Sequence, residues 1–399
     1  MRLALAGHKQ ASPALLERLA HDPNWSVVHR VARRKRADLS PELLTVLSRS
    51  SSYNVYTLVA ANSKTPPETL RELVGKHIAD DELAGNPSLP PDLLEAFVSD
   101  VNNRLIESLT KNPSLSADQI ERLAQRALQV PEGRGLGHFC YLAHHRRTTV
   151  EQLERWARIP LTEVQHEVAK SRRTPIALLE YLARTAPRSA LSGIVVNPNV
   201  TPQILELLAV RAVEMKPLTD AQILQAPEYM RHEYTQDRYY HRNALLKTVV
   251  KHPLCPRSVF DLLLPETDEK LLRMMVENLA CPGDILERLW PHLERLGLHE
   301  NLGVLVYFAA NPNCPPHLLE QMFQSLGEVA PRFCEAMLHC LARNPNTPAA
   351  VLEQISYQTD WRLLECLAEN PNCPPDVLRG IQLEAVLRDI KLKNNLLER

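Results

Sequence analysis

Cysteine and histidine are the residues of this chain best suited to metal binding or nucleophilic chemistry, and the sequence has eight Cys and fifteen His. Sites of that kind hold them at short spacings such as C-x-x-C or H-E-x-x-H. The cysteines form no C-x-x-C pair, and His232-Glu233 lacks the second His of a zinc-protease helix. No G-x-S-x-G, P-loop or G-x-G-x-x-G occurs. The sequence therefore predicts no catalytic residue, no metal site and no cofactor.

Clusters of basic residues offer a second chemistry, because they attract phosphates and acidic protein surfaces. The candidates occupy the opening turns of three copies of a repeated motif, and they are Arg33, Arg34, Lys35, Arg36, Arg146, Arg147, Arg172 and Arg173. Since the motif keeps a fixed register, we expect these residues on one edge of the molecule, here called the basic edge. The alternative is a solvated loop face without a ligand.

Tyrosine and arginine alternate in the longest stretch between two copies of the motif, an insertion at about 214–243. Its candidate contact residues are Tyr229, Arg231, Tyr234, Arg238, Tyr239, Tyr240 and Arg242. Such residues are favoured contacts for proteins and for unstacked bases. Glu228, Glu233 and Asp237 balance the arginines, which weakens the nucleic-acid interpretation. The alternative is an elongated helix pair that buries its own tyrosines.

A repeated motif must position all these residues. It is plainest in AANPNCPPHLLEQMF (309–323), ARNPNTPAAVLEQIS (342–356) and AENPNCPPDVLRGIQ (368–382). With the Asn of Asn-Pro as position zero, Leu or a similar residue recurs at positions eight and eleven in about thirteen copies. A spacing of three places both positions on one face of a helix. Trp156 stands at position eleven, and we expect Trp25, Trp290 and Trp361 to be core residues too.

Each copy predicts a helix, a turn and a shorter second helix. Ser12-Pro13 and Thr65-Pro66 are expected to supply an N-cap and a first-turn proline, and Asn-Pro should end the preceding helix. Cys255, Cys281, Cys314 and Cys373 share position three, where stacked helices would hold them roughly 8–10 Å apart. That spacing favours packing over a disulfide or a metal site.

The motif resembles the leucine-rich repeat variant family, whose second half is matched by AHDPNWSVVHRVA at 20–32. The resemblance implies a right-handed α-solenoid of helices and shorter, sometimes 3₁₀, helices, and the longer copies are similar to HEAT repeats. One architecture of that family carries an iron–sulfur domain, but the first cysteine here is Cys140. We predict a solenoid over 1–382 and a C-terminal capping helix over 383–399. No N-terminal cap is recognisable, so either a partner or second copy covers that edge or the cap is degenerate.

Bulk properties exclude some classes of function. The formal net charge is −1, although basic residues exceed acidic ones in the first 200 positions and the reverse holds afterwards. No stretch has the length of a signal peptide or membrane span, and scattered cysteines are typical of the cytoplasm. We therefore predict a non-catalytic, cytoplasmic scaffold that binds a protein through its concave or loop edge. The alternative is a solenoid that binds nucleic acid through the basic edge, as HEAT-like DNA glycosylases do.

Overall fold

The computed structural model describes residues 1–34, 39–74, 80–99, 105–130, 135–266, 269–296, 302–328, 331–357 and 360–382, and every regular element within them is a helix. This confirms the predicted all-α repeat solenoid as a fold class. The handedness and the number of repeats stay predictions. Lys35, Arg36 and the expected capping helix at 383–399 lie outside the described residues. Within those residues, no helix combines the length and apolar character needed to cross a bilayer.

The chain forms two compact units, each built from helix pairs. Unit 1 comprises Met1–Leu182 and Val196–Asn199, and unit 2 comprises Ala183–Val195 and Val200–Arg399. The first helices of the pairs in unit 1 are α2 (Pro13–Ala20), α4 (Pro41–Ser48), α6 (Pro67–Leu73), α8 (Pro91–Ser99), α10 (Ala117–Gln129) and α12 (Val150–Ala157). The second helices are α1 (Arg2–Gly7), α3 (Trp25–Ala32), α5 (Tyr53–Ala60), α7 (Asp80–Gly85), α9 (Ile106–Thr110), α11 (Phe139–Leu142) and α13 (Thr162–Lys170), with a 3₁₀ turn η3 (Leu136–His138) before α11.

Unit 2 continues the alternation, and α14 (Ile176–Thr185) runs across the boundary between the units. Its first helices are α16 (Pro202–Val213), α20 (Arg257–Leu263), α22 (Gly283–Leu296), α24 (Pro316–Gln324), α26 (Ala349–Ser356) and a helical stretch at 375–382. Its second helices are α15 (Ser192–Val195), α19 (Tyr240–Val250), α21 (Glu269–Glu277), α23 (Leu302–Ala310), α25 (Pro331–Arg343) and α27 (Trp361–Ala368). Three 3₁₀ turns, η4 (Arg188–Ala190), η5 (Leu264–Glu266) and η6 (Ser325–Glu328), precede α15, α21 and α25.

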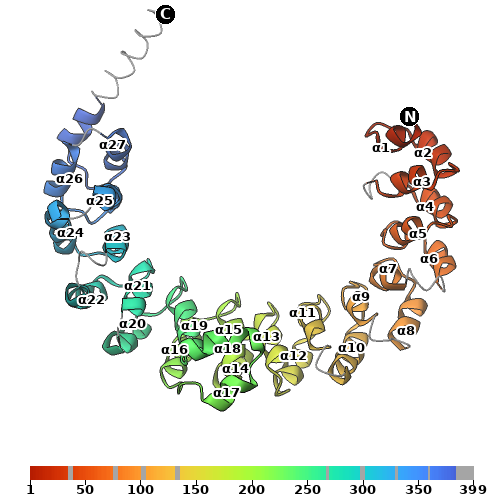
Figure 1. Ribbon diagram of the computed structural model, residues 1–399, viewed down its shortest axis with the longest axis horizontal. Coiled ribbons are helices and arrows are strands. Elements are labelled where there is room, and N and C mark those ends of the chain that lie inside the picture. Colours follow the sequence, from red (N-terminus) through yellow and green to blue (C-terminus); the bar gives the residue numbers. More distant parts are fainter. Residues whose placement is uncertain are drawn as a thin grey trace, which may run out of the picture. The chain divides into compact units, whose positions relative to one another are not determined.

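Helices of one kind stack on one another and so form two layers in each unit (Figure 1). In unit 1, α2 contacts α4 and α4 contacts α6, while α1, α3, α5, α7 and α9 contact one another in turn. In unit 2, α19, α21, α23, α25 and α27 do the same. The second helix is not always the shorter one, because α25 has 13 residues and α24 has 9. The longer spacing of 33 residues between Asn311 and Asn344 accommodates this helix.

The core is the pair of apolar columns that the sequence predicts. Positions eight and eleven face inward between the two layers and are buried in almost every copy, as in Leu70, Leu123 and Leu352, each 0% exposed. Phe97 and Leu378 are half-buried exceptions. Position three is buried as well, and burial raises the pKa of the Cys255 and Cys314 thiols to about 12. These cysteines therefore pack in the core as expected, and the raised pKa keeps their thiols protonated.

The hydrogen bonds of the side chain at position zero explain why asparagine recurs there. Asn344 is 3% exposed, and its side-chain Nδ2 donates to the carbonyls of Ala309 (2.8 Å) and Asn311 (2.7 Å) in the preceding repeat. Its Oδ1 accepts from the backbone N–H of Asn346 at 2.9 Å. The amides of Asn86, Asn112, Asn197, Asn278, Asn311 and Asn370 make the same pair of donations. We call this series of bonds the asparagine ladder.

Helix starts follow the expected cap chemistry at Ser12 but not at Thr65. The Ser12 hydroxyl accepts from the N–H of Leu15, and Pro13 occupies the first turn of α2. Thr65 is 1% exposed and precedes the N-cap, which is Pro66. Its hydroxyl donates instead to the carbonyl of Val59 at 2.6 Å, so it closes the turn onto the end of α5. The prediction that Thr65 is an N-cap is therefore wrong.

Candidate binding surfaces

His145 and Ser171 stand at position zero, and they preserve the asparagine ladder where the arginines begin. His145 Nε2 lies 3.0 Å from the carbonyl oxygen of Asn112, and its Nδ1 accepts from the N–H of Arg147 at 3.2 Å. A carbonyl only accepts, so Nε2 carries the proton and the ring copies the donor and acceptor of an Asn amide. Burial and the charges of Arg146, Arg147 and Arg173 lower the pKa of His145, which favours this neutral form.

The four arginines of these two turns are all exposed, but they do not have the same role. Arg146 Nε donates to the carbonyl of Pro113 at 2.9 Å, and Arg173 donates to the carbonyl of Arg146. Both thus bond the preceding repeat, as Ser114 does through its hydroxyl to Pro87. Among the described residues, the Arg147 and Arg172 side chains make no hydrogen bond or ion pair. The basic edge therefore offers Arg147 and Arg172 as its ligand-binding candidates.

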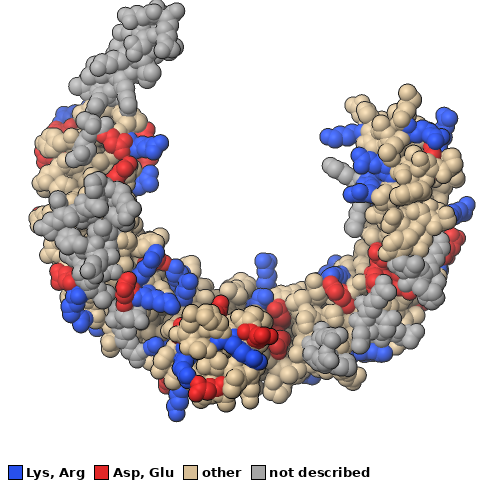
Figure 2. Space-filling model, in the orientation of Figure 1, with Lys and Arg blue, Asp and Glu red and all other residues tan. Residues whose placement is uncertain are grey.

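Arg33 and Arg34 form a separate group at the other end of unit 1. Arg34 donates to the carbonyls of Ala6 (3.1 Å), His8 (2.8 Å) and Lys9 (3.3 Å), so it caps the end of α1. Arg33 is exposed at the C-cap of α3. Basic side chains gather over α1 and α3 (Figure 2). Helices α4 to α11 separate this group from Arg146, so the two groups do not form one continuous site.

Five arginines of the first helices are neutralised by acidic residues of a neighbouring repeat. These ion pairs join neighbouring first helices, and they are Arg71–Asp92, Arg122–Glu95, Arg155–Glu121, Arg257–Asp284 and Arg288–Asp261. Hydrogen bonds from Arg122 and Gln119 lower the pKa of the Glu95 carboxyl to about 2. These five arginines therefore have their charges balanced by neighbouring carboxylates, unlike Arg147 and Arg172.

The insertion folds into two short helices between α16 and α19. They are α17 (Asp220–Gln225) and α18 (Glu228–Gln236), which contact each other and are here called the insertion hairpin. Arg238 holds its ends together, because its guanidinium donates to the carbonyl of Leu218 and to Asp220 while its own carbonyl accepts from the N–H of Leu218 at 2.8 Å. Arg231 Nε donates to the carbonyl of Ala226 at 2.9 Å. These two arginines, predicted to contact a partner, are used within the hairpin.

Some tyrosines of the insertion pack within it, and others are exposed as a contact surface requires. Tyr234, Tyr240 and His241 form a half-buried cluster with ring centroids 5.1–5.6 Å apart, as the alternative of a self-packed helix pair expected. Tyr239 is 41% exposed, and Arg242 lies over its ring at 5.5 Å. Tyr229 is 80% exposed. Leu224 on α17, which lies outside the Tyr/Arg pattern of the sequence, is 68% exposed.

Of the three further tryptophans predicted to be core residues, Trp290 is buried, Trp361 is half-buried and Trp25 is a surface residue. Trp25 is 56% exposed, because it begins α3 and lies outside the two core columns. It lines a shallow hollow of about 340 Å³ between the turns of the first two repeats of unit 1, with His21 and Arg49. In unit 2 a second hollow of about 500 Å³ lies beside Leu279, which is 62% exposed.

Within the described residues, one group of side chains could hold a metal ion. It consists of Glu335, His339 and Asp360 from α25 and the start of α27, three residues that no sequence motif connects.

Comparisons with known proteins leave the function open. No family model matches the chain, and no curated protein matches it. The crystal structure of an engineered protein is similar over 82% of this chain and 93% of that one, at 12% sequence identity and a TM-score of 0.11. A TM-score this low carries no argument about fold or function.

Proposed function

We propose that the chain is a non-catalytic repeat scaffold that binds a protein partner, with the insertion hairpin as its main contact. One observation carries this proposal. Helix α18 has nine residues and none of them is buried, so packing against the chain gives it little stability. It displays Tyr229, and the neighbouring helix α17 displays Leu224. Aromatic side chains such as Tyr are enriched at the centres of protein interfaces.

The proposal also draws support from the architecture. Stacked helix pairs offer long surfaces built from many repeats, and the insertion is the longest departure from the repeat. The eight cysteines, all within the described residues, form no disulfide, in keeping with a proposed cytoplasmic location.

Replacing Leu224 and Tyr229 together by serine is expected to weaken partner capture by at least about tenfold, because two exposed anchors of an interface are removed. The measurement is quantitative mass spectrometry of proteins retained by the immobilised full chain at low and high salt. A hydrophobic contact should persist at high salt.

The control is Tyr357→Ser, since Tyr357 is 76% exposed and lies at the C-cap of α26 in the same unit. A protein that the hairpin variant fails to retain and Tyr357→Ser still retains supports the proposal. Equal capture of every protein by all three chains would exclude the hairpin as the contact.

A second candidate function, nucleic-acid binding, is favoured by the unpaired arginines on two neighbouring turns of unit 1. Phosphate contacts release counterions, so binding weakens steeply with salt. Replacing Arg147 and Arg172 by alanine should reduce the slope of log K against log salt by roughly 1 for each phosphate that the variant no longer neutralises. Fluorescence anisotropy with a short duplex and a single strand measures this slope.

The matched control removes the same charge from paired arginines, Arg122 and Arg155, which engage Glu95 and Glu121. Both variants lower the net charge by two. If their slopes change equally, the basic edge has no specific role, and the absence of binding at low salt would reject this function altogether.

A further inference from the structure

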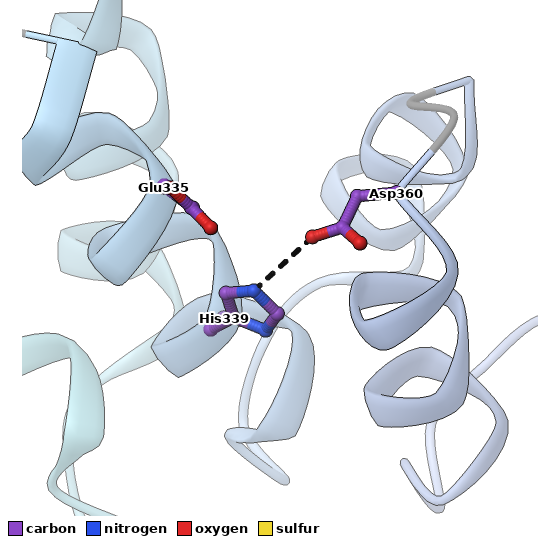
Figure 3. A group of neighbouring side chains, drawn as sticks. All are labelled: Glu335, His339 and Asp360. Atoms are coloured by element: carbon purple, nitrogen blue, oxygen red, sulfur yellow. Dashed lines mark ion pairs between the residues drawn. The ribbon is translucent and has the colours of Figure 1, made fainter.

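The second helices α25 and α27 bring three metal-ligating side chains together in unit 2. Glu335 and His339 are one turn apart on α25, so they share a face of the helix. Asp360 is the N-cap of α27, which contacts α25. One ligand atom from each of the three residues lies within 4.8 Å of the others, and His339 and Asp360 point toward each other (Figure 3).

Two of the three side chains are already oriented by other bonds. Asp360 Oδ1 accepts from the N–H of Arg362 at 3.1 Å, which leaves Oδ2 facing His339 Nε2 at 3.4 Å. On the other side of the imidazole ring, His339 Nδ1 lies 3.5 Å from Cys366 Sγ, a thiol that is 2% exposed. A metal-binding histidine is commonly fixed in this way, through its second ring nitrogen.

The distances suit a small divalent ion. With metal–ligand bonds of about 2.0–2.2 Å, a tetrahedral site separates its ligand atoms by roughly 3.4 Å. The His339–Asp360 distance already has this value. Glu335 is exposed, so its side chain is free to rotate the remaining ångström or so towards the other two ligands.

We propose that Glu335, His339 and Asp360 bind a divalent transition-metal ion of the zinc class, joining the second helices of two neighbouring repeats. One imidazole nitrogen and two carboxylates provide three ligands, and water completes the coordination. The imidazole favours zinc-class ions over Mg²⁺ and Ca²⁺, which prefer oxygen ligands alone. When the ion binds, His339 Nε2 supplies its lone pair and the ring proton resides on Nδ1, facing Cys366 Sγ.

The site is independent of the insertion hairpin, and its role is to fasten α25 to α27. Without the ion, the same atoms form a helix cap and a contact between His and a carboxylate. Binding of the ion stabilises the folded state by mass action, and we expect the amide hydrogens in the first turn of α27 to exchange more slowly.

Competition with a zinc indicator tests the proposal on the full, metal-stripped chain. The wild type should bind one Zn²⁺ more tightly than His339→Asn does, by at least about tenfold. Asp360→Asn should weaken this binding as well without unfolding α27, because Asn is as good an N-cap as Asp. The control is His317→Asn, which removes a histidine that faces a single carboxylate, Glu287, at 3.9 Å in the same unit.

Two results would overturn the assignment. One is equal Zn²⁺ binding by the wild type, His339→Asn and Asp360→Asn. The other is a loss in His317→Asn as large as the loss in His339→Asn. Co²⁺ spectra test the ligand set separately. Nitrogen and oxygen ligands give only weak visible bands, whereas an intense charge-transfer band would show that Cys366 is a ligand and that the proposed set is wrong.

Slower hydrogen exchange in α27 upon addition of Zn²⁺ supports a link between the helices. It should be absent in Asp360→Asn. Protection that is unchanged by Zn²⁺ in the wild type would rule out the fastening role.

Discussion

Replacing Asn344 by alanine is expected to lower the free energy of unfolding by about 2–4 kcal/mol. Its amide makes three hydrogen bonds in a buried turn, and the change leaves the carbonyls of Ala309 and Asn311 without this donor. A buried polar group that loses its partner costs about 1–3 kcal/mol. Urea denaturation followed by circular dichroism measures the effect.

Asn346→Ala in the same turn is the matched control. Asn346 also donates to two carbonyls of the preceding repeat, Pro312 at 2.7 Å and Cys314 at 3.2 Å, but it is half-buried and water can replace it. We expect a loss of only about 1 kcal/mol. If the two variants lose equal amounts of unfolding free energy, burial of the asparagine ladder is not the reason why asparagine recurs at position zero.

Trp156→Ala is expected to cost about 3–5 kcal/mol, the usual range for removing a buried aromatic side chain. Trp156 is 2% exposed at position eleven of α12, and its ring meets Phe139 edge-on with centroids 5.4 Å apart. Alanine leaves a cavity between the two helix layers of unit 1. Thermal and urea unfolding of the full chain provide the measurement.

Trp25→Ala provides the comparison, because the residue type is the same and only the burial differs. Trp25 is 56% exposed, and surface substitutions usually change stability by less than about 0.5 kcal/mol. A large loss for Trp25→Ala, or a small one for Trp156→Ala, would contradict the burial described for the two residues.

These two tryptophans show how far the sequence can predict the fold. Trp156 belongs to a column that recurs through the chain, so the register places it in the core. Trp25 stands at neither recurring apolar position, and only its residue type indicates burial. Thr65 fails for a related reason. The pattern Thr-Pro is typical of an N-cap, but here two prolines follow, the helix starts one residue later, and the hydroxyl turns inward to Val59.

The candidate surfaces were harder to predict, because the repeat pattern indicates where a side chain lies but not which hydrogen bonds it makes. Arg34, Arg146 and Arg173 occupy the expected edge, yet their guanidinium groups reach carbonyls of neighbouring turns. Their long side chains replace bonds that Asn or Ser makes elsewhere. Arg147 and Arg172 have the same residue type and no such bond among the described residues. Only the three-dimensional arrangement distinguishes the two classes.

The Glu335–His339–Asp360 group was missed for a different reason. The two ligands on α25 are separated by one turn, but the third comes from the following second helix, across a turn and a whole first helix. Motif searches use short spacings, and this spacing depends on how the repeats stack. Aligning neighbouring second helices and searching for His, Asp and Glu at adjacent positions would have revealed this group.

The asparagine ladder has a consequence for how a chain of this kind can change its length during evolution. Each rung joins an amide in one turn to the backbone of the turn before it, so every turn is both acceptor and donor. Excision of residues 312–344 would leave Asn311 followed by Pro345. Asn370 would then face the carbonyls of Ala309 and Asn311, the same partners that Asn344 has now. Duplication or deletion of a whole period therefore conserves the bonding, whereas a deletion of any other length breaks it.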